Sequence, residues 1–203
     1  MFGYRRERPF STSRRTPAPA PISEEQKTHS RAALLDAAEA LFYERGIQAV
    51  GMDAIRTAAG IPLKRIYGMF STKEDLVVAV LQQRDRRWRA SLTAYVEQHE
   101  DPRERVLSIF DWLERWFADP DYRGCAWINA YGELGSTSPA ILAEVRAHKQ
   151  AFHEQITKWV EAATNVPAEP VSLLAEGAIV TAAITGDPKA ARPARAATEA
   201  LIN

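Results

Sequence analysis

Two short helical segments around a tight corner constrain the fold of this chain more than any other feature. The segments cover residues 52–59 and 63–70, and only three residues, Gly60 to Pro62, separate them. Gly60 tolerates the positive φ that a sharp corner requires. Pro62 fits the first turn of the second helix, because the N–H that it lacks has no partner there. The sequence therefore predicts a helix-turn-helix.

The outer face of the second segment is suited to contact DNA. Once the inward-facing positions are removed, the remaining residues are Leu63, Lys64, Arg65, Tyr67 and Gly68. Two cations, an aromatic hydroxyl and a glycine that permits close approach suit the major groove of DNA. In the alternative interpretation, the segment is a helical hairpin of a larger α-helical domain and its cations form an ordinary solvated face.

The rest of the chain also has helical periodicity, so we predict an all-α fold of about nine helices and no strand. A buried helix face runs from Leu34 to Phe42, and Gly46 ends that helix. The later helices are marked by capping signals or apolar runs. These signals are a capping box at Ser71–Glu74, Asp101-Pro102, Ser138-Pro139 with a helix toward Ala163, the apolar run Val171–Thr185, and a short helix after Pro188.

Composition limits the class of protein and its compartment. The formal net charge of the 203 residues is zero, so a DNA-binding surface has to come from local clustering of cations. The single cysteine, Cys125, cannot form a disulfide framework. No apolar run approaches the roughly 18 residues of a membrane span, and the basic start has no apolar stretch of a signal peptide. We therefore expect a cytoplasmic protein without a membrane partner.

The pattern along the chain predicts three regions. Residues 1–22 are expected to be a flexible basic tail, 23–72 a helix-turn-helix DNA-binding domain, and 73–203 a helical effector-binding and dimerisation domain. The tail is either a solvated leader or a basic arm that adds phosphate or minor-groove contacts.

The stretch from Arg31 to Leu81 resembles the N-terminal domain of the TetR family of bacterial transcriptional regulators. The resemblance runs from AALLDAAEALFYERG through the AAG turn and the Ile-Tyr…Phe of the second short helix to STKEDLVVAVL. Two departures stand out, because family members usually carry Thr where Val50 and Gly51 stand and Ser where Pro62 stands. Both departures remove small polar groups that often reach phosphate.

The resemblance implies roles for individual residues at the DNA. Tyr67 is expected to contact a phosphate, Lys73 to clamp the backbone, and Lys64 and Arg65 to lie nearest the base edges. The complete DNA-binding set that we predict is Gly51, Met52, Leu63, Lys64, Arg65, Tyr67, Gly68, Thr72 and Lys73.

The apolar segment Val171–Thr185 is expected to be a subunit interface. It carries one charged residue, Glu176, and is rich in Ala and Gly, which favours close helix approach on several sides. The resemblance implies a homodimer whose last two long helices pair as a four-helix bundle, here through residues 168–202. Pro193 is expected to kink or shorten the last helix.

Aromatic and polar residues between these regions predict a pocket for a small-molecule effector. The predicted lining consists of Trp112, Trp116, Trp127, Asn129, Tyr131, Glu133, His148 and Phe152. For any one of these aromatics the alternative is plain core packing.

Other chemistry finds little support in the sequence. His148 and His153 lie on different faces of one helix, so no metal pair forms, and no cofactor motif or catalytic set can be assembled. We expect no enzyme activity, no metal and no cofactor. Cys125 is interpreted as a buried small hydrophobe, with a redox sensor as the alternative.

These observations together predict a homodimeric transcriptional regulator. We expect a repressor that a small-molecule effector releases from a palindromic operator in double-stranded DNA. The helix that begins near Ser71 is expected to carry the motion, since it is the only predicted link between the domains. The alternative is a helical module that binds a small molecule or a protein and whose helix-turn-helix is vestigial.

Overall fold

The computed structural model describes residues 23–203 of the chain. Within this range the regular structure consists of α-helices and one short 3-10 helix, without a strand, so the all-α prediction is confirmed. The predicted basic tail, residues 1–22, lies outside the described residues.

The helices follow one another with short connections. Their bounds are α1 Glu24–Arg45, α2 Met52–Ala59, α3 Leu63–Met69, α4 Lys73–Val96, α5 Pro102–Phe117, α6 Ala126–Leu134, α7 Pro139–Ala163, α8 Glu169–Thr185, the 3-10 helix η1 Pro188–Ala190, and α9 Ala191–Leu201.

Side-chain caps set several of these bounds. Asp101 accepts a hydrogen bond from Arg103 N–H and Ser138 accepts one from Ile141 N–H, so two predicted helix starts are confirmed. The capping box of α4 joins Thr72 to Asp75, one residue later than the predicted Ser71–Glu74.

Pro193 neither kinks nor shortens the last helix. It lies in the first turn of α9, which begins at Ala191. The first turn tolerates a residue without an N–H, because that group has no partner inside the helix there.

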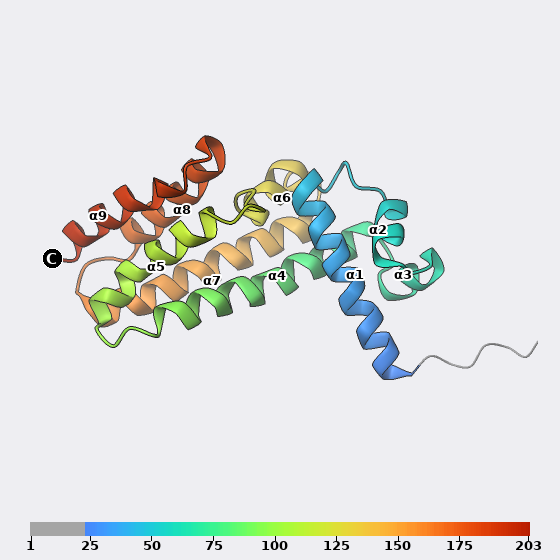
Figure 1. Cartoon of the computed structure of the whole chain (residues 1–203), viewed down its shortest axis with the longest axis horizontal. Coiled ribbons are helices and arrows are strands. Elements are labelled where there is room, and N and C mark those ends of the chain that lie inside the picture. Colours follow the sequence, from blue (N-terminus) through green and yellow to red (C-terminus); the bar gives the residue numbers. More distant parts are fainter. Residues whose placement is uncertain (1–22) are drawn as a thin grey trace, which may run out of the picture.

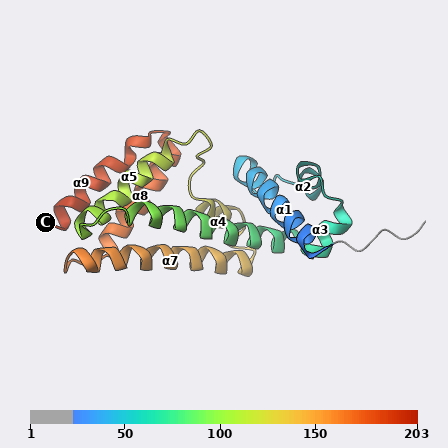
Figure 2. The ribbon, with the colours of Figure 1, turned by 60° about the horizontal axis from the view of Figure 1, so that its bottom comes forward.

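The molecule is elongated, with α1–α3 at one end and α8–α9 at the other (Figure 1). The long helices α4 and α7 run side by side between the two ends, and α5 lies along them (Figures 1 and 2). Helix α4 packs against α1 at one end and against α5 and α7 along its length. None of the helices between Ser23 and Asn203 combines the length and apolar character that a bilayer crossing requires.

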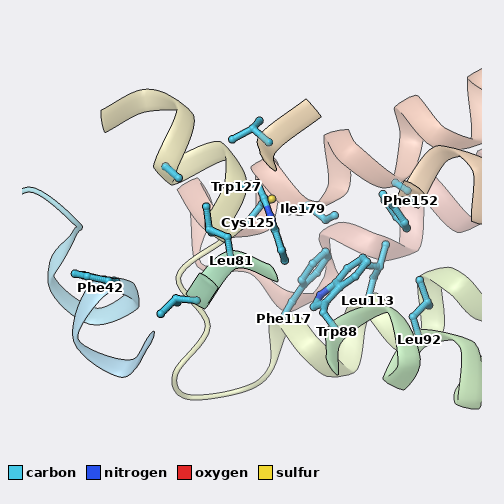
Figure 3. Packing of buried hydrophobic residues seen from close by; sticks show 14 of the residues in the cluster. Phe42, Leu81, Trp88, Leu92, Leu113, Phe117, Cys125, Trp127, Phe152 and Ile179 are labelled. Atoms are coloured by element: carbon cyan, nitrogen blue, oxygen red, sulfur yellow. The ribbon is translucent and has the colours of Figure 1, made fainter. Parts of the chain in front are cut away.

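An aromatic cluster fills the core between α4, α5, α6 and α7. The ring of Trp127 stacks on His148 with 3.4 Å between ring centroids, and Trp88 meets Phe152 edge to face at 5.0 Å. Figure 3 shows Trp88, Trp127 and Phe152 among the buried side chains. Trp127, His148 and Phe152 are all buried. Edge-to-face and offset contacts of this kind add to the stabilisation that comes from burial of the rings.

A polar pair is attached to this cluster. His148 Nδ1 lies 2.7 Å from Asp85 Oδ1, and Arg89 also donates hydrogen bonds to Asp85. Burial lowers the pKa of His148, and the hydrogen bond to Asp85 offsets only part of this effect, so the neutral ring donates from Nδ1–H. Burial opposes the charge on Asp85, but the hydrogen bonds from His148 and Arg89 outweigh it and lower the pKa of Asp85 to about 2.

We expect the free energy of unfolding to decrease on acidification in two stages. Both groups have a lower pKa in the fold than in the unfolded chain, so their contributions are complete above the unfolded pKa and are lost as the pH falls. His148 loses its contribution below pH ~6.5 and Asp85 between pH ~4 and pH ~2. Asp85→Asn should cost about 1–2 kcal/mol at pH 7 after allowance for solvent screening.

Thermal unfolding of both proteins between pH 7 and pH 2.5 measures this effect. The gap in melting temperature between wild type and Asp85→Asn should narrow toward low pH. A gap of constant size would contradict the assignment. Asp53→Asn is a matched control, because the Asp53 carboxylate is exposed and, among residues 23–203, forms an ion pair only with Arg56 on its own helix.

Candidate nucleic-acid interface

The corner between α2 and α3 has the predicted geometry. Gly60 adopts a left-handed conformation with φ 66°. Ile55 on α2 and Ile66 on α3 are fully buried and fix the two helices against the rest of the small domain. Because both apolar faces are buried, the remaining face of α3 is fixed toward solvent.

That outer face of α3 carries the residues predicted to read DNA. Lys64, Arg65 and Gly68 are exposed, and Tyr67 is 48% exposed. Leu63 at the start of the helix is half-buried. A side chain added at Gly68 would meet no atom within 4 Å, so a partner can approach the backbone closely at this point. The exposed face is compatible with insertion into a major groove.

The N-termini of α2 and α4 carry the remaining residues of the predicted DNA-binding set. Gly51 caps α2 through its backbone conformation alone, without a side-chain hydrogen bond, and Met52 behind it is half-buried. Thr72 caps α4 and accepts a hydrogen bond from Asp75 N–H at 3.0 Å. Its own O–H remains free to donate to a phosphate. Helix N-termini attract anions, so both positions suit the DNA backbone.

Lys73, which we predict to contact the DNA backbone, is also held by contacts within the protein. Its Nζ donates to the carbonyl of Ile47 at 2.5 Å and lies 5.9 Å from the ring centroid of Phe42. Burial lowers the pKa of Lys73, and the charge of Glu133 opposes that effect only in part. An ammonium group has three donors, so two remain for a phosphate.

The turn between α1 and α2 is held by a carboxylate from α6. Ile47 N–H donates to Glu133 Oε1 at 2.9 Å, and Gln48 N–H donates to Glu133 Oε2 at 2.8 Å. The Gln48 side chain donates back to the Glu133 carbonyl at 2.7 Å. Gly46 begins this turn with φ +87°, and an added side chain there would press on the Glu133 carboxylate at 3.3 Å.

This contact changes the expected connection between the two regions. The sequence predicted α4 as the only link, but α6 also holds the turn between α1 and α2, through Glu133. This turn belongs to α1–α3, which we predict to bind DNA and call the DNA-reading region. Sequence reasoning missed this role because Ile47 and Glu133 are 86 residues apart. The only local signal is Gly46, a position at which close approach of another group demands glycine.

Replacing Glu133 with alanine should loosen the turn between α1 and α2. Two backbone N–H groups lose their acceptor, and we expect amide hydrogen exchange at Ile47 and Gln48 to accelerate by roughly tenfold. Exchange measured by NMR checks this expectation. Glu161→Ala removes an exposed carboxylate from α7 and should leave both amides unchanged. Unchanged protection in Glu133→Ala would mean that the carboxylate does not hold the turn.

The residues predicted to line an effector pocket do not gather around one cavity. Trp127, His148 and Phe152 fill the core, and Tyr131 is 57% exposed. Glu133 holds the turn described above. The other three are spread over separate surfaces: Asn129 beside Glu133 in a small crevice, Trp112 in a groove between α4 and α5, and Trp116 at the boundary of that groove and a second cavity.

The second cavity lies between α1, α4, the end of α5 and the loop that follows α5. It has a volume of about 460 Å³ and is lined by α1, α4, Trp116 of α5 and the loop 118–125 between α5 and α6. Tyr43 anchors this loop, since its hydroxyl donates to the Gly124 carbonyl at 2.7 Å and accepts from Arg123 N–H at 2.9 Å. The cavity therefore touches both the DNA-reading region and the helical body.

Cys125 is buried, and Lys149 Nζ lies 3.5 Å from its sulfur while forming an ion pair with Glu176. Among residues 23–203 no three His, Cys, Asp or Glu side chains converge as a metal site would require.

Comparison with known proteins shows which family this chain resembles. Residues 34–80 match the family model described as bacterial regulatory proteins, tetR family. The chain is 28% identical over 155 residues to the HTH-type transcriptional activator FasR of Mycolicibacterium smegmatis, an alignment that covers 73% of this chain and 67% of that protein. It is 34% identical over 74 residues to Rv1255c, an uncharacterized HTH-type transcriptional regulator of Mycobacterium tuberculosis, with 36% of this chain and 37% of that protein covered.

The fold extends the similarity beyond the matched segment. The crystal structure of SCO4454, a TetR-family transcriptional regulator from Streptomyces coelicolor, superimposes with a TM-score of 0.78 at 27% identity and covers 86% of this chain and 95% of that one. Residues 34–80 therefore match the family model of TetR-family DNA-binding regulators, and the fold of the whole chain is that of TetR-family transcriptional regulators.

Proposed function

We propose that the protein is a homodimeric, ligand-responsive regulator that reads a palindromic operator with two copies of α3. The observation that carries this proposal is the exposed face of α3, on which Lys64, Arg65 and Tyr67 are all accessible while Ile66 behind them is buried. A burial pattern of this kind presents cations to a groove without exposing the core.

The exposed face of α8 and α9 supports the second part of the proposal. Leu173 and Ile184 are 73% and 79% exposed, and Val180 between them is 39% exposed. Gly177 lies in the same row at helical spacing and has open space at its Cα. Leu201 adds an exposed apolar side chain on α9. Contiguous exposed apolar side chains on two adjacent helices favour burial against a second copy.

A symmetric dimer also fits the proposed DNA target. Two recognition helices that are one DNA turn apart, roughly 34–36 Å, match a palindromic operator and bind it far more tightly than one helix could. The FasR relative is named a transcriptional activator. For this chain we propose repression, in which an effector that prefers another conformation releases the operator.

Selection of genomic DNA fragments by the purified protein tests the proposal. Fragments retained at increasing salt should share a two-fold symmetric motif, and binding should weaken steeply as salt rises. A reporter gene behind the selected fragment should be expressed more strongly when the regulator is deleted. Retention of fragments without a common motif would contradict operator recognition, and lower expression after deletion would contradict repression.

A further inference from the structure

The cavity between α1, α4 and the loop 118–125 has a distinctive chemistry. An aromatic corner forms one side, where Trp116 and Tyr122 meet edge to face with 4.9 Å between ring centroids. Asp119 and Asp121 flank this corner on the loop, and Glu44 lines the cavity from α1, where one of its carboxylate oxygens lies 3.3 Å from Arg45 Nε. Aromatic faces next to carboxylates are the surroundings that proteins use to bind organic cations.

Two basic residues of the cavity are already paired with carboxylates of α1. Arg84 forms an ion pair with Glu39 at 2.8 Å and covers the ring of Tyr43, and Arg87 forms an ion pair with Asp36 at 3.1 Å. These pairs tie α4 to α1 and leave little guanidinium charge for an anion.

The loop arginine is also engaged, while the loop carboxylates retain their charge. Arg123 folds back and donates to the carbonyls of Pro120 and Tyr122. Asp119 accepts one backbone hydrogen bond from Asp121 N–H, and the Asp121 carboxylate has no ion pair or hydrogen bond among the described residues. With five carboxylates against three guanidinium groups, the lining carries a net negative charge.

We infer that this cavity is an effector site for an organic cation with an apolar, aromatic-sized body. The volume of about 460 Å³ falls within the range of small-molecule sites. The cation would lie against Trp116 and Tyr122, and the carboxylates of Asp121 and Glu44 would balance its charge. The inference rests on the proposed function, since it names the ligand class of the proposed effector.

The position of the cavity connects such a ligand to both ends of the molecule. The Tyr122 hydroxyl donates to the Ile179 carbonyl of α8 at 2.7 Å, and a side chain at Gly124 would collide with Ala183 of α8 at 2.9 Å. The same loop is bound to α1 through Tyr43. A ligand in the cavity therefore contacts α1 of the DNA-reading region and the loop 118–125, which is fixed on α8, the proposed dimer helix. It can thus favour one arrangement of α1 relative to α8.

A pair of ions with nearly the same shape and opposite charge provides the test. Tetraphenylphosphonium is the cationic probe and tetraphenylborate is the anionic one, and calorimetry measures the binding of each to the full chain. We expect the cation to bind at least about tenfold more tightly. Glu44→Gln/Asp121→Asn should weaken the binding of the cation by about tenfold. Because both side chains are exposed, this variant should keep its fold.

The matched control is Glu97→Gln/Glu100→Gln, which removes two exposed carboxylates at the far end of α4 and should leave cation binding unchanged. Equal affinity for the two ions, or unchanged cation affinity in Glu44→Gln/Asp121→Asn, would overturn the inference.

Operator affinity, measured with and without the cation, separates this inference from the proposed function. A change of at least about tenfold supports an effector site. Selective cation binding that leaves operator affinity unchanged would overturn the regulatory role of the cavity while operator recognition stands. Selective cation binding by a chain without any sequence-specific DNA binding would overturn the proposed function instead, and the cation site would remain.

Discussion

Replacing Lys64 and Arg65 together with alanine should reduce the preference for operator over unrelated DNA by about 100-fold or more. Each side chain is exposed on α3 and can form hydrogen bonds to base edges, and a good base contact contributes about 1–3 kcal/mol to discrimination. Ile66 follows these two residues and is fully buried, so it holds α3 against the rest of the domain. The variant should therefore keep its fold. Competition binding at fixed salt measures the preference directly.

The matched control for this variant is Arg86→Ala/Lys189→Ala. Both of these side chains are exposed and both lie outside the DNA-reading region, so the loss of net charge is the same. An equal decrease in preference for both variants would mean that the effect comes from total charge. An unchanged preference in the Lys64 and Arg65 variant would remove α3 from the reading surface.

Replacing Ile184 with glutamate should separate the proposed dimer into monomers. The side chain is 79% exposed in the single chain, so the substitution costs the monomer little, but it would place a carboxylate inside an apolar interface. The mass in sedimentation should decrease from twice 22.6 kDa to 22.6 kDa. Operator affinity should decrease by at least about 100-fold, because each half-site would then be bound independently.

Tyr131→Glu is the control for that experiment. It also places a carboxylate on a large exposed side chain, 57% exposed, but lies on α6 away from α8 and α9. The control should remain dimeric. A wild-type protein that sediments as a monomer, or an Ile184→Glu variant that stays dimeric, would place the interface elsewhere or remove it.

Local chemistry made much of the fold predictable. The starts of α5 and α7 follow from Asp101 and Ser138, whose side chains cap the next turn, and the corner before α3 follows from Gly60. The start of α4 was predicted one residue early because Ser71 with Glu74 and Thr72 with Asp75 both satisfy the capping-box pattern. The choice between them depends on how α4 packs, which the local sequence does not contain.

The candidate sites were predictable only where they lie on one element. The exposed face of α3 follows from helical periodicity, since the positions that face inward are apolar. The contact of Glu133 with the turn before α2 joins residues that are far apart in the chain, and no periodicity reports it. The aromatics predicted for the effector pocket were ambiguous for the same reason, because Trp127 stacks on His148 only after α6 and α7 pack.

Directed cleavage of DNA from α3 tests the central claim most directly. Gly68→Cys, in a chain that also carries Cys125→Ala, provides one exposed thiol at a position with open space, to which an iron chelate can be attached. The bound protein should cut the operator in two clusters related by two-fold symmetry and centred about one helical turn apart. Cleavage that is absent, or that is no more localised than cleavage from a chelate at Glu97→Cys on the far end of α4, would contradict the claim that α3 enters the major groove.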